Sequence, residues 1–227
     1  MQDYYSQKLS ADRLMRVYEV ASPRVRRYLE SEIEFVKSNL APDSTVIELG
    51  CGYGRILPPL AERAGFVVGI DSSIDSIKSG IEYLSVCDNC TLAVMNAEHL
   101  GFADGTFETV ICIQNGISAF KVDPVTLVRE SLRICKDNGA TIFSTYSPKF
   151  WEHRLEWFEE QSKHGLLGEI DYDKTGDGNI VCKDGFTATT FTHEQFENIA
   201  ETLGVTCEIT EIDDSSLFCM FRKITLE

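Results

Sequence analysis

The sequence predicts an α/β fold: a doubly wound, mainly parallel seven-stranded sheet with a C-terminal antiparallel hairpin and additional N-terminal helices. Between positions 45 and 145, short apolar runs alternate with amphipathic segments. This order of strands and helices is typical of a parallel sheet covered on both faces. Two strand-like runs, 205–212 and 217–222, then follow each other directly, as in an antiparallel hairpin. With 227 residues, 43% of them apolar, the chain can bury a substantial core.

The elements can be assigned in chain order. Ser22 and Pro23 start an N-terminal helix, because serine caps a helix and proline needs no hydrogen-bond partner in the first turn. Thr192, Gln195 and Gly204 mark a late helix by a capping box and a C-terminal glycine. Further strands are expected at 45–48, 66–70, 91–95, 109–113 and 140–145. Further helices are expected at 54–64, at 150–164, along Ile74, Ile77, Ile81 and Leu84, and along Val125, Val128, Leu132 and Cys135. The glycine-containing stretch 169–190 suggests one or two hairpins.

Composition limits the possible partners and location. A formal net charge of −15 argues against nucleic acid, because binding to phosphates requires a cationic face. No apolar run approaches the ~20 residues that span a membrane, and no signal peptide is recognisable, so the expected location is cytoplasmic. The eight cysteines are expected to be reduced thiols. Cys87 and Cys90 have the spacing of half a zinc site, but no second half exists, so no metal is expected.

The strongest motif is Val46-Ile-Glu-Leu-Gly-Cys-Gly-Tyr-Gly-Arg55, a strand that runs into a glycine-rich turn and a helix. Ligands of open α/β sheets bind beside such turns, at the carboxyl ends of the strands. The carboxylate of Glu48 suits an ammonium group better than a pyrophosphate. Asp71 ends the next strand, where a carboxylate can accept hydrogen bonds from both hydroxyls of a ribose.

These motifs, together with the segment 95–110, resemble three motifs of the class I S-adenosylmethionine (SAM)-dependent methyltransferases. The resemblance implies SAM as cofactor, with S-adenosylhomocysteine as product. It places Glu48 near the SAM amino group, Asp71 on the ribose and Asn96 with Ala97 at the adenine edge. The implied cofactor-binding residues are Glu48, Gly50, Cys51, Gly52, Tyr53, Asp71, Ser72, Ile74, Asn96, Ala97, Glu98, Gln114 and Asn115.

The resemblance also bears on the domain organisation. It implies one methyltransferase domain over 1–227. Within it, we expect N-terminal helices that form a lid (1–40), a SAM-binding core (41–146), an insert that covers the site (147–191) and a C-terminal helix with the hairpin (192–227).

The acceptor is expected to be a small molecule. Family members that methylate nucleic-acid or protein amide nitrogens often carry Asn/Asp-Pro-Pro-Tyr/Phe after the fourth strand, where this chain reads Gln114-Asn-Gly-Ile117. Candidate acceptor-binding residues are Tyr4, Tyr5, Tyr18, Phe120, Tyr146 and Trp151. No residue is singled out as catalytic, because in-line methyl transfer needs a general base only for a protonated acceptor. Two alternatives remain: a SAM-binding module or sensor without transferase activity, and a nicotinamide-dependent oxidoreductase, against which Arg55 in place of a third glycine argues.

Overall fold

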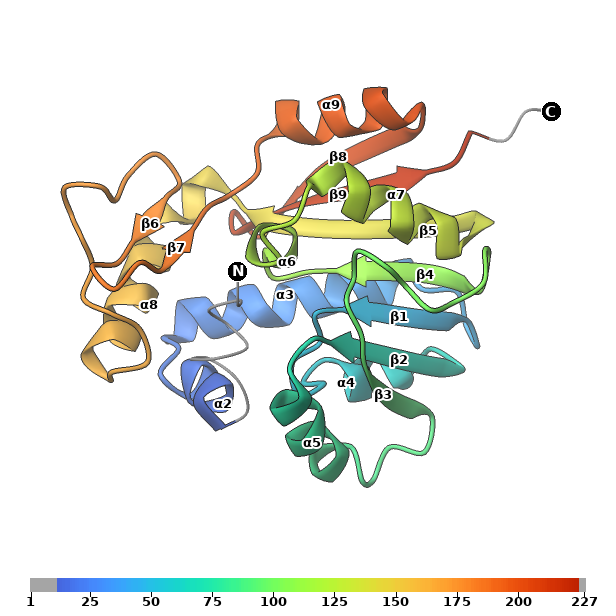
Figure 1. Cartoon of the computed structure of the whole chain (residues 1–227), viewed down its shortest axis with the longest axis horizontal. Helices are drawn as coiled ribbons and strands as arrows, with labels where there is room; N and C mark the ends of the chain where they lie inside the picture. The colour runs from blue at the N-terminus through green and yellow to red at the C-terminus, as the bar shows by residue number, and fades with distance from the viewer. Residues whose placement is uncertain (1–11, 225–227) are drawn as a thin grey trace.

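The computed structural model describes residues 12–224, and a seven-stranded sheet forms its centre (Figure 1). The strand order is β3-β2-β1-β4-β5-β9-β8, and β9 alone runs antiparallel to its neighbours. The strands are β1 (Thr45–Leu49), β2 (Phe66–Asp71), β3 (Cys90–Val94), β4 (Phe107–Cys112), β5 (Cys135–Tyr146), β8 (Thr206–Ile212) and β9 (Ser216–Arg222). The predicted parallel sheet with a C-terminal antiparallel hairpin is therefore confirmed.

Helices cover both faces of this sheet. They are α2 (Asp12–Glu19), α3 (Pro23–Asn39), α4 (Leu57–Ala61), α5 (Ile74–Tyr83), α6 (Gly116–Ala119), α7 (Pro124–Ile134), α8 (Trp151–Lys163) and α9 (His193–Leu203), with a 3₁₀ turn at Pro148–Phe150. One face packs against α3, α4 and α5, and the other against α7 and α9. The predicted caps are present: Ser22 caps α3, and Thr192 with Gln195 forms the capping box of α9. No helix within residues 12–224 is both long and apolar enough to cross a bilayer.

The sheet is buried on both sides, which explains why its strands read as continuous apolar runs. Val110 and Ile111 are neighbours in β4, and both are fully buried. Val110 belongs to the cluster beneath α7 and α9, whereas Ile111 belongs to the cluster beneath α3 and α4. Successive side chains of a strand thus enter opposite layers of the core.

A third apolar cluster lies beyond the carboxyl ends of the parallel strands. There α2, the first half of α3 and α8 pack with a small hairpin, β6 (Ile180–Val181) and β7 (Thr187–Ala188). Figure 1 shows this lobe at the left end of the sheet. Tyr28 of α3 contacts the end of β5 and the 3₁₀ turn, since the centre of its ring lies 5.2 Å from that of Tyr146 and 5.0 Å from that of Phe150. The lobe therefore stands where ligands of open α/β sheets bind.

The helix expected at 54–64 is shorter than the sequence suggests. Gly52 and Gly54 have φ values of +57° and +81°, which no α-helix contains, so the chain stays in a turn as far as Ile56. Pro58 and Pro59 have no backbone N–H, and α4 accommodates them because they lie in its first turn.

The expected apolar stripe of α5 is wrong for two of its residues. Ile74 is 56% exposed and Ile81 is 64% exposed, whereas Ile77 is buried. The helix instead turns its Gly80 side inward: a Cβ on Gly80 would lie only 2.4 Å from Leu92 Cδ1. A glycine that allows close backbone approach sets the rotation of this helix, and the isoleucines do not.

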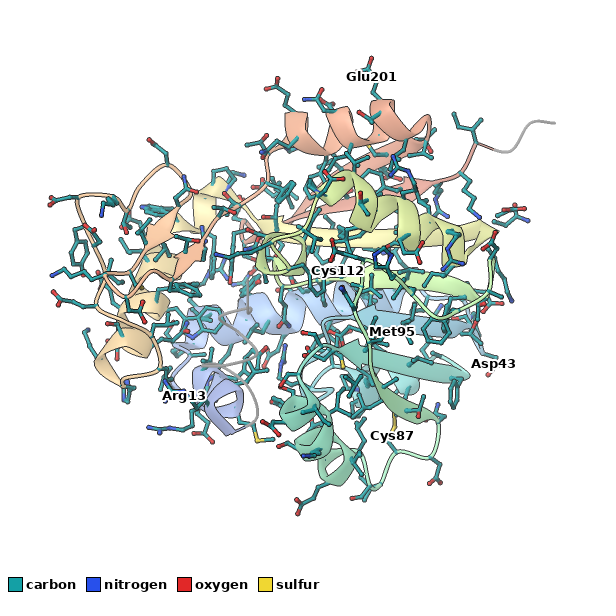
Figure 2. All side chains as sticks on the ribbon, in the orientation of Figure 1. Arg13, Asp43, Cys87, Met95, Cys112 and Glu201 are labelled. Atoms are coloured by element: carbon teal, nitrogen blue, oxygen red, sulfur yellow. A yellow bond between two sulfur atoms is a disulfide. The ribbon has the colours of Figure 1, made fainter. Side chains whose placement is uncertain are left out.

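The expectation that all cysteines are reduced is also wrong, because Cys87 and Cys90 form a disulfide. A turn brings the two residues together, with Cys90 N donating a hydrogen bond to Cys87 O at 3.4 Å. Their Cα atoms lie 5.6 Å apart, within the usual range for a disulfide. Figure 2 labels Cys87 at the edge of the sheet near β3.

Candidate active site

The glycine loop after β1 begins the site. Its Gly50 and Cys51 N–H groups donate to Ile70 O at 2.8 and 2.9 Å, which fixes the loop against β2. Gly50 and Gly52 have positive φ values of 75° and 57°. A Cβ would lie 2.8 Å from Phe120 Cζ at Gly50 and 2.6 Å from Leu14 Cδ2 at Gly52. The positive φ values therefore favour glycine at these two positions, and a side chain there would also displace the ends of Phe120 and Leu14.

Asp71 joins this loop to the start of α5. One carboxylate oxygen accepts a hydrogen bond from Gly52 N at 2.9 Å, and the other accepts from Ser73 N at 2.8 Å. Ser73 is itself the N-cap of α5. Asp71 thus holds the glycine loop against the first turn of α5, and its carboxylate lies at the wall of a cavity.

A cavity of about 160 Å³ opens beside Asp71, at the carboxyl ends of β1, β2 and β4. The helices α2 and α6 close it from the other side. Its lining residues are Leu14, Tyr18, Glu48, Gly50, Cys51, Gly52, Arg55, Ile56, Asp71, Ser72, Ser73, Ser76, Ile113, Gln114, Gly116, Ala119 and Phe120.

Two ionisable side chains in this cavity have buried atoms that find no hydrogen-bond partner within residues 12–224. Glu48 Oε2 and the Nε and Nη2 atoms of Arg55 are buried and unpaired. Burial raises the pKa of Glu48 to about 8, although the nearby guanidinium of Arg55 opposes the increase. The Arg55 guanidinium carbon lies 4.4 Å from the ring centre of Tyr18, which covers it as a cation–π partner. The cavity is therefore complementary to a ligand that carries both an ammonium and a carboxylate.

The loop after β4 forms the far wall of the cavity. Gln114 and Asn115 have φ values of 56° and 61°, an uncommon conformation for residues with side chains. Gln114 N donates to Glu32 Oε2 and to Ser144 Oγ, both at 2.8 Å. Glu32 also accepts a hydrogen bond from Ser216 Oγ at 2.7 Å, and burial raises its pKa to about 7. A carboxylate from α3 thus holds the strained loop from below.

A second, smaller cavity of about 90 Å³ adjoins the first. It is lined by Leu14, Val17, Tyr18, Gln114, Tyr146, Trp157, Phe158, Gln161 and Phe186. The side-chain hydroxyl of Tyr18 donates to Gln114 Oε1 at 3.3 Å, so these two residues form part of the common wall. Trp157 Nε1 donates to Val17 O at 3.0 Å, which connects α8 to α2.

The position of α2 over both cavities is held by a second contact. Arg13, labelled on this helix in Figure 2, donates to Gly165 O at 2.8 Å and to Leu166 O at 3.1 Å. Both carbonyls follow the end of α8. The two helices are therefore joined at two places, and together they cover the carboxyl end of the sheet.

The structure brings part of the predicted cofactor site together. Seven of the thirteen predicted residues line the first cavity: Glu48, Gly50, Cys51, Gly52, Asp71, Ser72 and Gln114. The others lie outside it: Tyr53, Ile74, Asn96, Ala97, Glu98 and Asn115. For all thirteen residues, a part in binding SAM stays a prediction.

Local contacts explain where these outlying side chains lie. Asn96 Oδ1 accepts from Glu98 N at 3.0 Å, which makes a turn, and Ala97 is buried in the apolar core. The Tyr53 ring packs edge-on against Tyr83, 5.1 Å away. Asn115 Nδ2 donates to the carbonyl of residue 189 at 2.8 Å, so this amide joins the loop to the hairpin.

The predicted acceptor residues divide similarly. Tyr18 and Phe120 line the first cavity, and Tyr18 and Tyr146 line the second. Trp151 lines neither, and Tyr4 with Tyr5 lies outside the described residues. Sequence reasoning missed Leu14, Arg55, Ile56, Ser73, Ser76, Ile113, Gly116 and Ala119 in the first cavity. Arg55 could have been found, since it directly follows the last glycine of the loop.

Comparison with known proteins agrees with this geometry. A family model described as a methyltransferase domain matches residues 46–139. The 2-methyl-6-phytyl-1,4-hydroquinone methyltransferase of Synechocystis sp. is 29% identical over 167 residues, which cover 66% of this chain and 52% of the relative. The chain thus spans about half the length of this relative.

Solved structures share the fold. A SAM-dependent methyltransferase from Aquifex aeolicus superposes with a TM-score of 0.64 at 15% identity, covering 93% of this chain and 98% of the other. The N-methyltransferase NodS from Bradyrhizobium japonicum WM9, crystallised with S-adenosylhomocysteine, gives a TM-score of 0.62 at 14% identity, with 96% of each chain covered. At this level of identity the likeness establishes the architecture.

Proposed function

Because residues 46–139 match a methyltransferase domain and the fold is shared with a solved SAM-dependent methyltransferase, we propose that this chain is a class I SAM-dependent methyltransferase that transfers the methyl group of SAM to a small-molecule acceptor. The observation that carries the proposal is the pair of ionisable side chains, Glu48 and Arg55, whose buried atoms lack partners among the described residues beside the glycine loop that Asp71 supports. The amino-acid end of SAM carries an ammonium and a carboxylate. It would satisfy both groups, which otherwise remain buried at a cost in free energy.

In this proposal each group of the first cavity has one task. Glu48 accepts from the ammonium, and Arg55 donates to the carboxylate with the N–H groups that lack partners. Asp71, which lines the cavity and supports the glycine loop, accepts from the ribose hydroxyls. The nicotinamide alternative fits less well, because Glu48 would face a pyrophosphate with a negative charge.

The chemistry is an in-line displacement. SAM supplies a methyl group on a sulfonium: the acceptor's electron pair bonds to the methyl carbon, and the sulfur–carbon pair stays on sulfur, which leaves S-adenosylhomocysteine. The protein's part is to align the two molecules and to exclude water. Gln114 and Tyr18 are placed for this, since they line both cavities. A second cavity, which adjoins the first and is lined mostly by aromatic and apolar side chains, supports a transferase over a sensor module.

A small-molecule acceptor is supported by the size and lining of the second cavity and by the net charge of −15, which disfavours nucleic acid. The Synechocystis relative, named for a hydroquinone substrate, agrees with this proposal. A cytoplasmic location remains a prediction from the sequence, and so does the division of the chain into a lid, a core, a cover and a C-terminal part.

Calorimetric titration with S-adenosylhomocysteine, with NADH as the comparison ligand, tests the cofactor. We expect micromolar binding of S-adenosylhomocysteine alone, at least tenfold weaker in Asp71→Ala and in Arg55→Met. Asp75→Ala is the matched control, because Asp75 is an exposed carboxylate in the first turn of α5. Binding of NADH instead, or an Asp71→Ala variant with unchanged affinity, contradicts the proposal.

A further inference from the structure

The second cavity has a chemistry of its own. Resting on the proposed function, we propose that it is the acceptor site and that it selects an uncharged aromatic molecule carrying a hydrogen-bond acceptor. Four features carry this inference: the place of the cavity, its aromatic walls, the charges near them and the polar groups that face it.

The place of the cavity makes it the route by which an acceptor meets the donor. It shares Leu14, Tyr18 and Gln114 with the first cavity, so molecules bound in the two cavities are separated only by this shared wall. Phe158 of α8 and Phe186 of the β6–β7 lobe contribute other parts of the lining. The part of a ligand that lies against Gln114 is therefore the part beside the first cavity.

The walls are mostly aromatic. Tyr146, Trp157, Phe158 and Phe186 contribute four rings, and Tyr18 contributes a fifth at the shared wall. Rings of this kind bind a flat unsaturated molecule by stacking and edge-to-face contact. A saturated chain would gain only the burial of its surface.

A buried cation stands behind two of these rings. The guanidinium carbon of Arg154 lies 4.6 Å from the ring centre of Tyr146 and 5.5 Å from that of Phe158. Arg154 is 1% exposed and donates to the carbonyls of Gly178 at 2.8 Å and Ala188 at 3.0 Å. The electron density of both rings already stabilises this positive charge. A cationic acceptor would add a second cation to the same rings and would be repelled.

An anionic acceptor is disfavoured for a different reason. Among residues 12–224, no lysine, arginine or histidine lines the second cavity. A carboxylate or phosphate taken into it would lose its hydration without gaining a charged partner. An uncharged ligand is neither repelled by Arg154 nor stripped of the hydration that a charge requires. The cavity therefore selects against both cations and anions.

Two amides supply the polar contacts. Gln114 Nε2 is buried and has no hydrogen-bond partner in the part of the chain that the structure describes, whereas Gln114 Oε1 accepts from Tyr18. Gln161, 3% exposed, contributes the other amide to the lining. A hydroxyl, carbonyl or ring nitrogen on the acceptor would satisfy Gln114 Nε2 at the end that faces the donor. The ligand class is therefore a neutral aromatic ring with one such atom.

The test uses three single-ring probes that differ in charge: phenol, benzoate and benzylammonium, each titrated at pH 7 into protein saturated with S-adenosylhomocysteine. Ligand-observed saturation-transfer NMR measures the affinities. We expect phenol to bind at least tenfold more tightly than either charged probe. Trp157→Leu should weaken phenol at least fivefold, and the matched control Trp151→Leu, on the same helix but outside the cavity, should not.

The outcomes separate the two proposals. If S-adenosylhomocysteine binds but the probes show no preference for phenol, the acceptor inference is overturned and the methyltransferase proposal stands. If S-adenosylhomocysteine does not bind, both are overturned. Should Trp157→Leu not fold, Phe186→Leu replaces it, with retained S-adenosylhomocysteine binding as proof of folding; unchanged phenol affinity in that variant overturns the site assignment.

Discussion

Glu32 gives the protein a pH-dependent stability that one substitution should remove. Its pKa is raised by burial from 4.5 to about 7, so the folded state holds this proton more tightly than the unfolded chain does. Stability is then greatest below pH 4.5 and falls as the pH rises through 7. A shift from 4.5 to about 7 corresponds to about 3 kcal/mol, at ~1.4 kcal/mol per pKa unit. Glutamine resembles the protonated carboxyl and does not titrate.

We therefore expect the free energy of unfolding of Glu32→Gln, relative to the native sequence, to rise by about 3 kcal/mol between pH 5 and pH 8. Urea unfolding at pH 5, 6, 7 and 8, followed by circular dichroism, measures it. Glu34→Gln is the matched control, because Glu34 lies on the same helix with its side chain 72% exposed. Glu48→Gln, measured separately, gives the contribution of the other buried carboxyl.

The reasoning is refuted if Glu32→Gln and the native sequence lose stability in parallel over this range. That result would mean that the hydrogen bonds from Gln114 and Ser216 offset the cost of burial and that Glu32 is ionised throughout. The sign of the effect is as informative as its size. A variant less stable than the native protein at pH 8 would show that the negative charge itself holds the loop.

Three further substitutions test the packing. Gly80→Ala should cost about 1–3 kcal/mol in urea unfolding, because its Cβ would lie 2.8 Å from the backbone oxygen of Tyr53; a neutral result would mean that α5 can shift outward. Arg154→Met should destabilise the protein by about 3 kcal/mol, since buried carbonyls lose their donors, and thermal unfolding that stays unchanged would contradict the buried role. Thr192→Ala should cost about 1 kcal/mol by the same assay through loss of the capping box with Gln195, and no change would indicate that the cap is replaced by water.

The features that the sequence predicts well are those that depend on residues close together in the chain. Buried parallel strands appear as apolar runs, and helix starts appear as Ser22 and Thr192. The glycine loop is also a local signal, because Gly50 and Gly52 must adopt positive φ values wherever the loop occurs. Asp71 can be predicted as a site residue for the same reason, because it directly follows the apolar run of the adjacent strand.

The features that it predicts poorly depend on contacts between distant segments. Glu32 lies in the run Glu30-Ser-Glu-Ile-Glu34, and nothing local separates it from its exposed neighbours. Its role follows from meeting Gln114, which is 82 positions away. The apolar stripe of α5 fails similarly, since a glycine that contacts β3 determines which isoleucines face the core. These contacts form only when distant segments pack together, so a single sequence does not reveal them.

The position of α2 between the two cavities affects the affinities of both substrates and the order in which they bind. Leu14 and Tyr18 belong to the walls of both cavities, so a molecule that fixes them in one changes the free energy of binding in the other. Such coupling is reciprocal: the first substrate alters the affinity of the second by the same factor as the second alters the first. A substitution at either residue therefore shifts the dissociation constants of both substrates together, and the preferred order of addition moves with it.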